Sequence, residues 1–244
     1  MDPEVSMARS ETRGTLRTYL KQIVYGGNDG IVTTFAIVAG FAGAKAQGSE
    51  AAAFGALAVL VFGLANLTAD GVSMGMGEFL SGRSARDIFH ARHREAEAAA
   101  RAHPAEAAAA LAHHLVTQGL DPAAARHAAD HLADSPKLMA DLSLRYDHGM
   151  EAPDAHNIAA RAGMTFAAFV TLGAIPILPF VLITGGLAFA VSLVATALAL
   201  ALLGGLRWAA SDQTLATCLA ETLAVGALCA AVAWGAGNLV AGLG

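Results

Sequence analysis

Side chains that can bind a cation recur at a fixed spacing in one apolar stretch of this chain. Asn66, Asp70, Met74 and Glu78 stand four residues apart, which places them on one slowly drifting face of an α-helix. They supply an amide oxygen, two carboxylates and a thioether. A soft thioether beside carboxylates favours ferrous iron or a similar transition metal over Mg²⁺ or Ca²⁺. Alternatively, Met74 is a packing residue and Asn66 forms a hydrogen bond between helices. The alignment of both with Asp70 favours an ion path.

Two further carboxylates, Asp29 and Glu221, also lie within apolar stretches. Ionisable residues inside membrane helices are costly and are functional candidates. Counted from the predicted cytosolic ends of their helices, Asp29, Asp70 and Glu221 share one depth of roughly 12–15 Å. Three acids at one level predict a shared cation site, while a contact between helices or subunits is the alternative for Glu221.

The elements that must position these acids follow from the composition of the chain. Hydrophobic residues make up 55% of the 244 residues and charged residues 14%, whereas about a quarter is usual for charged residues in soluble domains. A bilayer-spanning helix takes about 20 apolar residues. We therefore predict an all-α protein with five transmembrane spans, at residues 21–44, 51–80, 162–182, 187–206 and 214–243. Pro176, Pro179 and Gly185–Gly186 predict a tight turn between the third and fourth spans.

The basic residues predict the orientation of these spans. All of the fifteen Lys and Arg residues except Lys45 fall on one side of the predicted membrane, and that side is expected to be cytosolic. Five spans then place the N-terminus in the cytosol and the C-terminus on the opposite side. The net charge of −5 and the lack of a basic aromatic patch argue against a nucleic-acid partner. The alanine-rich composition suggests a bacterial inner membrane.

This pattern divides the chain into four parts. Residues 1–20 form a cytosolic N-terminal segment, 21–80 the first two spans, 81–160 a cytosolic module, and 161–244 the last three spans. The module is predicted to be helical, since it is rich in Ala, Glu and Arg. It is broken into about three helices at Pro104, at Gly119–Pro122 and at Ser135–Pro136, where Asp121 before a proline fits a helix N-cap.

The predicted module also holds all nine histidines of the chain. Spacings of three or four residues place two candidate ligands on one helix face in the pairs His90–His93, His93–Glu97 and His127–His131. Imidazole suits Zn, Fe, Ni and Cu alike. The module is thus a candidate metal-binding module, with a merely polar helical surface and a proton sensor as alternatives.

Glycines are dense around the first acid, in Gly26-Gly27-Asn28-Asp29-Gly30. They permit either close approach of a neighbouring helix or local unwinding that exposes backbone carbonyls to an ion.

These motifs resemble the vacuolar iron transporter family. The matching stretches are Tyr25–Gly40, Ala65–Ser81, Arg86–Asp87 and Ile175–Phe180. The resemblance extends over nearly the whole chain from about residue 15, with the same order of five spans, and its first two motifs are long and specific.

The resemblance implies a homodimer in membrane lipid whose ion path follows the subunit interface, lined by spans one and two. It also implies export of divalent metal from the cytosol in exchange for protons. Asp29 and Met74 match the metal-site aspartate and methionine of the family. Asn66 stands where some members carry a glutamate, and Asp70, one turn nearer the cytosol, is its candidate replacement. No tightly bound cofactor is implied, and the transported ion is expected to be Fe²⁺, with Mn²⁺ and Zn²⁺ as further candidates.

The predicted module departs further from the family pattern, which has Glu-x-x-Glu pairs and a Met-Met-x-x-Glu cluster. Asp87 and His90 stand near the first pair, and Glu97 is a looser candidate. Ser143 and Leu144 replace the methionines, and Asp147 replaces the glutamate.

We therefore expect a secondary transporter. The alternative is a membrane-tethered metal sensor or buffer that uses the histidine-rich module. An intramembrane enzyme is disfavoured, because no His-Glu-x-x-His or Ser-Lys arrangement lies in a span, and the chain carries no phosphate-binding loop.

Overall fold

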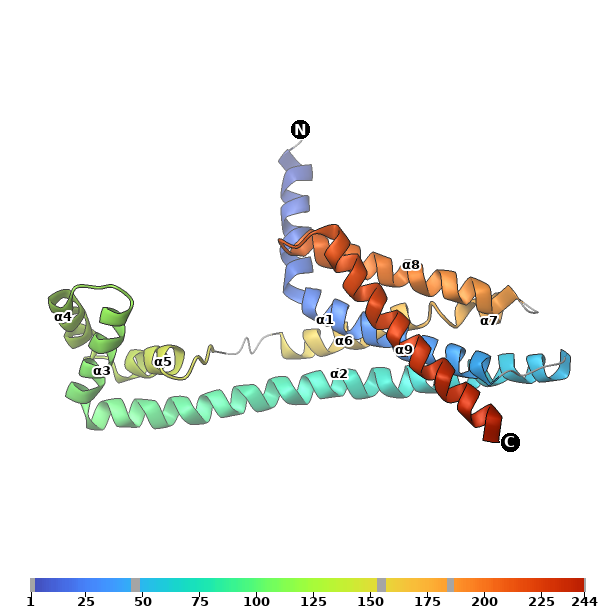
Figure 1. Ribbon diagram of the computed structural model, residues 1–244. Helices are drawn as coiled ribbons and strands as arrows, with labels where there is room; N and C mark the ends of the chain where they lie inside the picture. Colours follow the sequence, from blue (N-terminus) through green and yellow to red (C-terminus); the bar gives the residue numbers. More distant parts are fainter. Residues whose placement is uncertain (1–2, 45–48, 153–156, 184–186, 244) are drawn as a thin grey trace. The chain divides into compact units, whose positions relative to one another are not determined.

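The computed structural model describes residues 3–44, 49–152, 157–183 and 187–243, with residues 3–17, 49–54 and 243 described by their backbone alone. Over these residues the chain is helical and contains no strand, which confirms the all-α prediction (Figure 1). The helices are α1 (Pro3–Gly43), α2 (Ser49–Ala102), α3 (Pro104–Thr117), α4 (Pro122–Leu132), α5 (Pro136–Tyr146), α6 (Ile158–Gly173), α7 (Leu178–Leu182), α8 (Leu187–Ala210) and α9 (Leu215–Leu243).

The chain folds into two compact units. The first unit comprises Met1–Phe79 and Ala159–Gly244, and the second comprises Leu80–Ile158. Helix α2 contributes to both, because it continues without a break past residue 80 to Ala102. The end predicted for the second span therefore does not coincide with the end of a helix.

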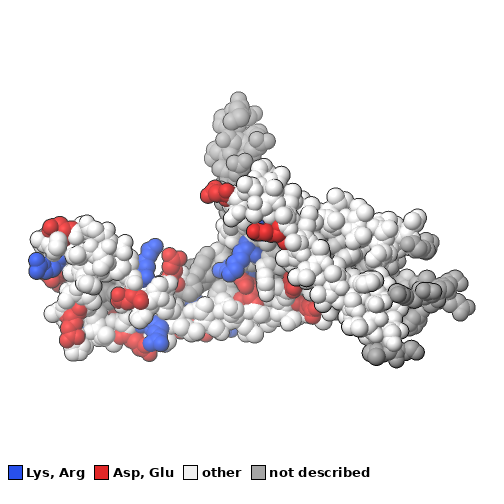
Figure 2. Space-filling view, viewed as in Figure 1, with Lys and Arg blue, Asp and Glu red and all other residues white. Residues whose placement is uncertain are grey.

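Three described helices contain stretches long and apolar enough to cross a membrane: Gly55–Ala102 of α2, Leu187–Ala210, and Leu215–Gly242 of α9. On the face shown in Figure 2, few charged side chains lie over α8 and α9. Helix α1 is long enough, but Asn28 and Asp29 lower the hydropathy of its apolar part. Length and hydropathy therefore select the helices of the second, fourth and fifth predicted spans, but not those of the first and third.

The third predicted span, residues 162–182, is not one helix. Helix α6 ends at Gly173, the chain turns, and α7 begins at Leu178. Pro176 and Pro179 explain the break, since proline lacks an N–H group and disfavours helical conformation in the preceding residue. The buried Ser192 of α8 donates a hydrogen bond of 2.6 Å to the carbonyl oxygen of Pro176. Residues 162–182 therefore form two helices joined by a turn, and their role as a membrane span stays a prediction. The glycines expected in the turn, at 185–186, lie outside the described residues.

Close backbone contacts join α1 to α6. A Cβ atom on Gly30 would collide with the carbonyl oxygen of Phe169, and one on Gly173 would lie 2.8 Å from the carbonyl oxygen of Gly30. At the other end of α1, a Cβ atom on Gly43 would collide with the carbonyl oxygen of Trp234 in α9. Small residues permit such contacts between membrane helices. Helix α1 is continuous through this region, so the alternative of local unwinding is wrong.

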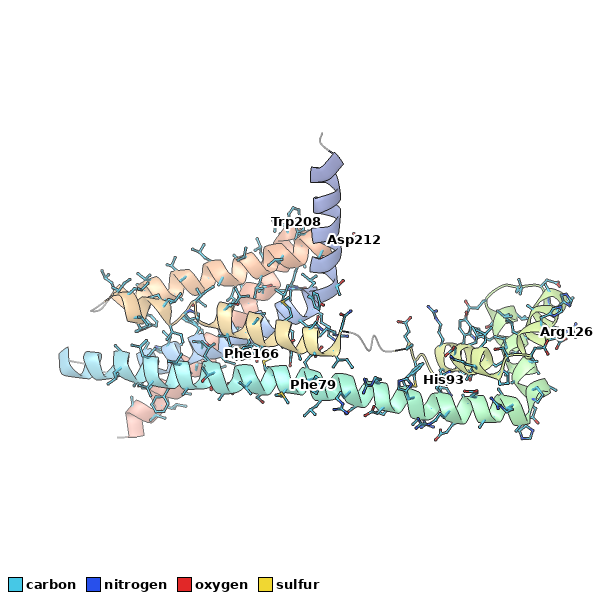
Figure 3. The ribbon with its side chains drawn as sticks, turned by 180° about the vertical axis from the view of Figure 1, so that it is seen from behind. Phe79, His93, Arg126, Phe166, Trp208 and Asp212 are labelled. Atoms are coloured by element: carbon cyan, nitrogen blue, oxygen red, sulfur yellow. The ribbon has the colours of Figure 1, made fainter. Side chains whose placement is uncertain are left out.

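A hydrophobic cluster in the first unit ties α1, α2 and α6 together. It is made of Phe35, Val38, Ala39, Val59, Leu67, Phe169 and Ile177. Phe166 of α6 packs over Gly71 and Gly75 of α2, where an added Cβ atom would lie 3.4 and 3.1 Å from its side chain (Figure 3). Helix α1 also packs against α8 and α9. The helices that carry Asp29 and Asp70 are thus fixed by shared neighbours.

The second unit combines the C-terminal part of α2 with the three short helices α3, α4 and α5. The helix breaks lie where proline and glycine predicted them, and Gly119 has a left-handed φ of 98°. Asp121 caps α4 by accepting hydrogen bonds of 2.9 and 3.2 Å from the backbone N–H groups of Ala123 and Ala124. The core of this unit consists mainly of small side chains: Ala100, Ala108, Leu111, Ala112, Ala129 and Met139.

We expect Gly30→Ala to destabilise the first unit, because its Cβ atom would overlap the backbone of α6, and overpacking of this kind costs about 1–3 kcal/mol. Thermal unfolding of the detergent-solubilised protein measures the loss. Gly163→Ala is the matched control, since no atom of a neighbouring element that the structure describes lies within 4 Å of the added Cβ atom. Equal melting temperatures for the two variants would contradict the close contact.

We expect Asp121→Ala to weaken α4 by about 1 kcal/mol, because loss of the cap leaves two backbone N–H groups without an acceptor. Hydrogen exchange of the α4 amides measures the effect as faster exchange. Asp130→Ala, at an exposed position later in the same helix, should leave the exchange rates of the first turn unchanged.

Candidate functional site

The four residues of the predicted ladder lie along one face of α2. Asn66, Asp70, Met74 and Glu78 are all partly buried. The residues immediately before them, at 65, 69, 73 and 77, are exposed. The ladder therefore runs along the boundary between the packed face of α2 and its open face, where an ion can reach it.

Asp29 and Asp70 lie close enough for their charges to repel each other. Asp29 is partly buried in α1, and Thr33 donates a hydrogen bond of 2.7 Å to its carbonyl oxygen. Asp70 precedes Gly71, whose added Cβ atom would lie 2.9 Å from Val170 of α6. A bound cation would balance the charges of two carboxylates that repel each other in an apolar setting. The structure thus brings together two of the three acids singled out in the sequence.

Met74 stands one helical turn after Asp70 and packs partly against the hydrophobic cluster of α1, α2 and α6. Met76, by contrast, is 52% exposed. The thioether of Met74, a soft ligand, thus lies one turn from the carboxylates, which are hard ligands. This combination suits Fe²⁺ better than Mg²⁺.

Glu78 is held by two other helices. Gln22 of α1 donates a hydrogen bond of 3.0 Å from Nε2 to its Oε1 atom. Arg161 of α6 forms an ion pair with the same oxygen at 3.2 Å. Neither partner was singled out in the sequence, because they stand far from Glu78 along the chain.

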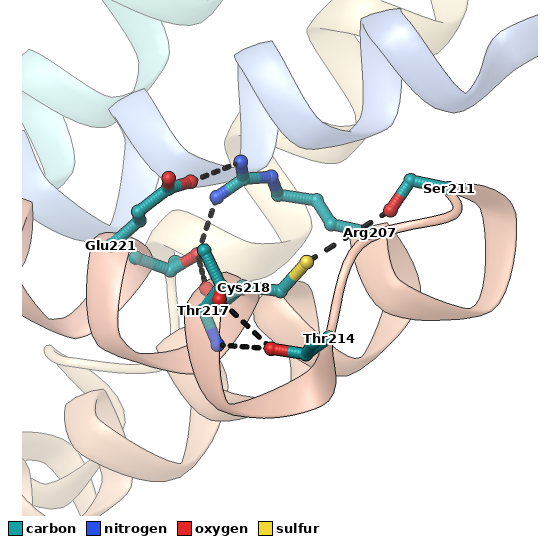
Figure 4. A network of polar contacts seen from close by, with 7 residues as sticks. Arg207, Ser211, Thr214, Thr217, Cys218 and Glu221 are labelled. Carbon is teal, nitrogen blue, oxygen red and sulfur yellow. Dashed lines mark hydrogen bonds and ion pairs between the residues drawn. The ribbon is translucent and has the colours of Figure 1, made fainter.

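Glu221 forms an ion pair with Arg207 at 2.6 Å, across the contact between α8 and α9 (Figure 4). Arg207 also donates a hydrogen bond of 3.1 Å to Thr222. Glu221 was expected to share a cation site with Asp29 and Asp70, but its described partner is a basic residue. This arrangement matches the alternative of a helix contact more closely, and a place for Glu221 in the path stays a prediction.

His93 of the second unit lies near two carboxylates. Its Nε2 atom lies 2.9 Å from Oδ1 of Asp141 in α5, and its Nδ1 atom lies 3.9 Å from Oε2 of Glu97 (Figure 3). Glu97 also pairs with Arg101 at 2.9 Å. The two carboxylates lie against different ring nitrogens, so they clamp the imidazole between α2 and α5 rather than converge on one ion. Asp141 was missed in the sequence, because its helix packs on α2 only in the fold.

The remaining candidates in the second unit are scattered. Asp87 lies 3.7 Å from Arg86, and Asp147 accepts a hydrogen bond of 2.9 Å from Ser143. His127 and His131 share a face, with ring centroids 4.5 Å apart, and His90 is exposed. Within the parts of the chain that the structure describes, no three His, Cys, Asp or Glu side chains are arranged to hold a metal ion. Metal binding by the second unit remains a prediction.

A cavity of about 240 Å³ lies among α2, α3 and α5 in the second unit. His114 and Tyr146 stack in its wall, with ring centroids 4.2 Å apart. Alanine and leucine make up half of its lining, a pattern that the sequence alone does not distinguish from an ordinary helical core.

The chain is similar to several known proteins, two of them along most of its length. The chain is 28% identical to vacuolar iron transporter 2 of Oryza sativa subsp. japonica over 95% of its own length and 91% of that protein's. It is 29% identical to vacuolar iron transporter 1 of Arabidopsis thaliana, over 92% and 87% of the two chains. A vacuolar iron transporter of Toxoplasma gondii is 45% identical over 83 residues, which cover 34% of this chain and 25% of that protein.

The model of the VIT family matches residues 20–238. This range includes the two acids that the structure brings together and every helix that positions them. The match confirms the resemblance carried by the motifs, and the chain belongs to the VIT family.

Proposed function

We propose that this chain is a secondary transporter that exports a divalent transition metal, Fe²⁺ and also Mn²⁺, from the cytosol in exchange for protons. The observation that carries the proposal is the proximity of Asp29 and Asp70, one turn from Met74, in a member of the VIT family. The names of its relatives, vacuolar iron transporters, support iron as the cargo.

The chemistry of the acid pair supports exchange. A divalent ion between Asp29 and Asp70 balances their two negative charges. When the ion leaves, protons can take its place, because a metal ligand must lose its proton to bind and regains it on release. Alternation between a metal-loaded and a protonated pair couples the two fluxes without leaving two unpaired charges in an apolar environment.

The exposed face of α2 supports a homodimer in a membrane. Large apolar side chains face outward along its first part: Leu57, Val61, Phe62, Leu64, Val72 and Met76. Such a surface needs lipid or a protein partner to cover it. A second copy on the ladder side, with lipid over the rest, would place the ion path at the subunit interface. We propose a cytosolic N-terminus and a C-terminus on the opposite side from the distribution of basic residues, and a bacterial inner membrane as the location.

The alternative of a metal sensor or buffer needs a metal site in the second unit, and the described residues of that unit do not assemble one. The names of the relatives, which are iron transporters, support transport rather than a covalent reaction as the activity proposed. Deletion of residues 90–156 separates the two functions: a transporter keeps some flux, and a sensor loses its metal response entirely.

We expect Asp29→Asn to lower Fe²⁺ and Mn²⁺ flux in proteoliposomes by about tenfold or more, because the amide keeps the shape of the carboxylate but removes a charge from the ion site. Proton flux, followed with a pH-sensitive dye, should fall in parallel. Asp70→Asn should behave alike, and Asp130→Asn in the second unit should not. Unchanged flux in Asp29→Asn would contradict the assignment.

We expect Met74→Leu to weaken Fe²⁺ uptake by about threefold or more while affecting Mn²⁺ less, because the substitution preserves volume and removes only the soft ligand. The ratio of the two apparent affinities is the measurement. Met76→Leu is the matched control, since Met76 lies on the exposed part of α2. An equal loss for both metals would assign Met74 to packing alone.

A further inference from the structure

Three helices of the first unit meet at one carboxylate oxygen. Oε1 of Glu78 in α2 lies 3.0 Å from Nε2 of Gln22 in α1 and 3.2 Å from a guanidinium nitrogen of Arg161 in α6. Glu78 is the last member of the ladder Asn66–Asp70–Met74–Glu78. An arginine therefore occupies the position at the end of the ladder where a cation would bind.

The two partners of Glu78 are held very differently. Gln22 is only 3% exposed, so its amide is fixed by the surrounding helices. The side chain of Arg161 is 38% exposed, and water can replace its contact with Glu78. The strongest arginine–carboxylate pairs are bidentate, with two parallel bonds to two oxygens, whereas Arg161 and Gln22 share a single oxygen. The geometry permits Arg161 to leave while Gln22 and Glu78 stay in place.

The position of Arg161 in its helix also weakens its hold. Helix α6 begins at Ile158, so Arg161 lies in the first turn, near the partial positive charge of the helix N-terminus. A cation there is repelled by its own helix and is retained chiefly by Glu78.

A further acceptor lies unused beside this carboxylate. Oε1 of Gln22 is buried and has no hydrogen-bond partner among the described residues, although buried polar atoms are almost always paired. An amide oxygen next to a carboxylate is a ligand set for a divalent cation or for the water that it carries. The oxygens of Gln22 and Glu78 thus offer acceptors that the guanidinium of Arg161 does not fully use.

We propose that Arg161 is a tethered counter-ion that a divalent metal displaces from Glu78 when it enters or leaves the ladder. This inference rests on the proposed transport function and extends it to ion selection. With no metal present, Arg161 neutralises Glu78. A monovalent ion offers Glu78 no more charge than the guanidinium already supplies, whereas a divalent ion does, so the exchange favours divalent ions.

The test removes the charge of Arg161 and measures metal binding and transport separately. In Arg161→Gln, we expect Mn²⁺ to bind the purified full-length protein about fivefold more tightly by calorimetry, because its competitor is gone. Binding is repeated in an Asp29→Asn background, where the signal from the Asp29–Asp70 pair is removed. Na⁺ at constant ionic strength should inhibit Mn²⁺ uptake by the Arg161→Gln protein in proteoliposomes and not uptake by the wild type.

Two variants show whether the effect acts through Glu78. Arg161→Lys keeps the charge and should retain the wild-type Mn²⁺ affinity within about twofold. In a Glu78→Gln background, Arg161→Gln should have no further effect, because the group for which it competes is gone. Arg92→Gln, which removes an exposed arginine of the second unit that pairs with Glu95, is the control for net charge.

Unchanged Mn²⁺ affinity in Arg161→Gln, or the same tightening in Arg92→Gln, would overturn the proposal. If Arg161→Gln does not give a monodisperse protein, Glu78→Gln is the deciding variant. In the Asp29→Asn background, a metal site at Glu78 requires this variant to bind Mn²⁺ about fivefold more weakly. Unchanged binding would overturn the proposal. A wild-type protein that binds Mn²⁺ as described but carries none across the membrane would refute the transport function and leave the counter-ion in place.

Discussion

The close backbone contact between α1 and α6 is the constraint on which the candidate site depends. At Gly30 and Gly173 the two helices approach so nearly that a single methyl group would separate them. Phe169, whose carbonyl oxygen faces Gly30, also belongs to the cluster that packs against α2. Because α6 touches both neighbours, it fixes the distance between α1 and α2. That distance places Asp29 within reach of the charge of Asp70.

The two units are stabilised in different ways. The first unit uses glycine contacts, large apolar side chains and a few polar links such as the one from Ser192 to Pro176. The second unit has an alanine-rich core, and each of α3, α4 and α5 begins with a proline in its first turn. A core of small side chains buries little apolar area per residue, so caps and ion pairs at the helix ends contribute a larger share of its stability.

The sequence was sufficient for the features that local chemistry determines. Long apolar runs gave the helices, prolines gave their breaks, and a four-residue spacing placed Asp70 and Met74 on one face. The sequence was not sufficient for features whose geometry depends on tertiary contacts. The glycines around Asp29 fit both close packing and unwinding, and only the position of α6 distinguishes the two. Pro176 and Pro179 predict a turn after the third span, whereas they divide residues 162–182 into α6 and α7.

The partners of the charged residues were likewise beyond local reasoning. Glu78 pairs with Arg161 and His93 with Asp141, and each pair joins residues that are distant in sequence. A pattern within one helix identifies which side chains share a face, but it does not identify the side chain opposite them. For the same reason, Glu221 was grouped with acids at its depth, although its described neighbour is Arg207.

The break in the third predicted span has an electrostatic consequence. Helix α6 ends at Gly173, in contact with Gly30, the residue that follows Asp29. The C-terminal end of a helix carries about half a negative elementary charge, from peptide dipoles and carbonyl groups without intrahelical partners. This partial charge lies beside the acid pair and increases the attraction of the site for any cation. A continuous helix through Pro176 would carry that charge away from Asp29. The prolines therefore shape the field around the site as well as the path of the chain.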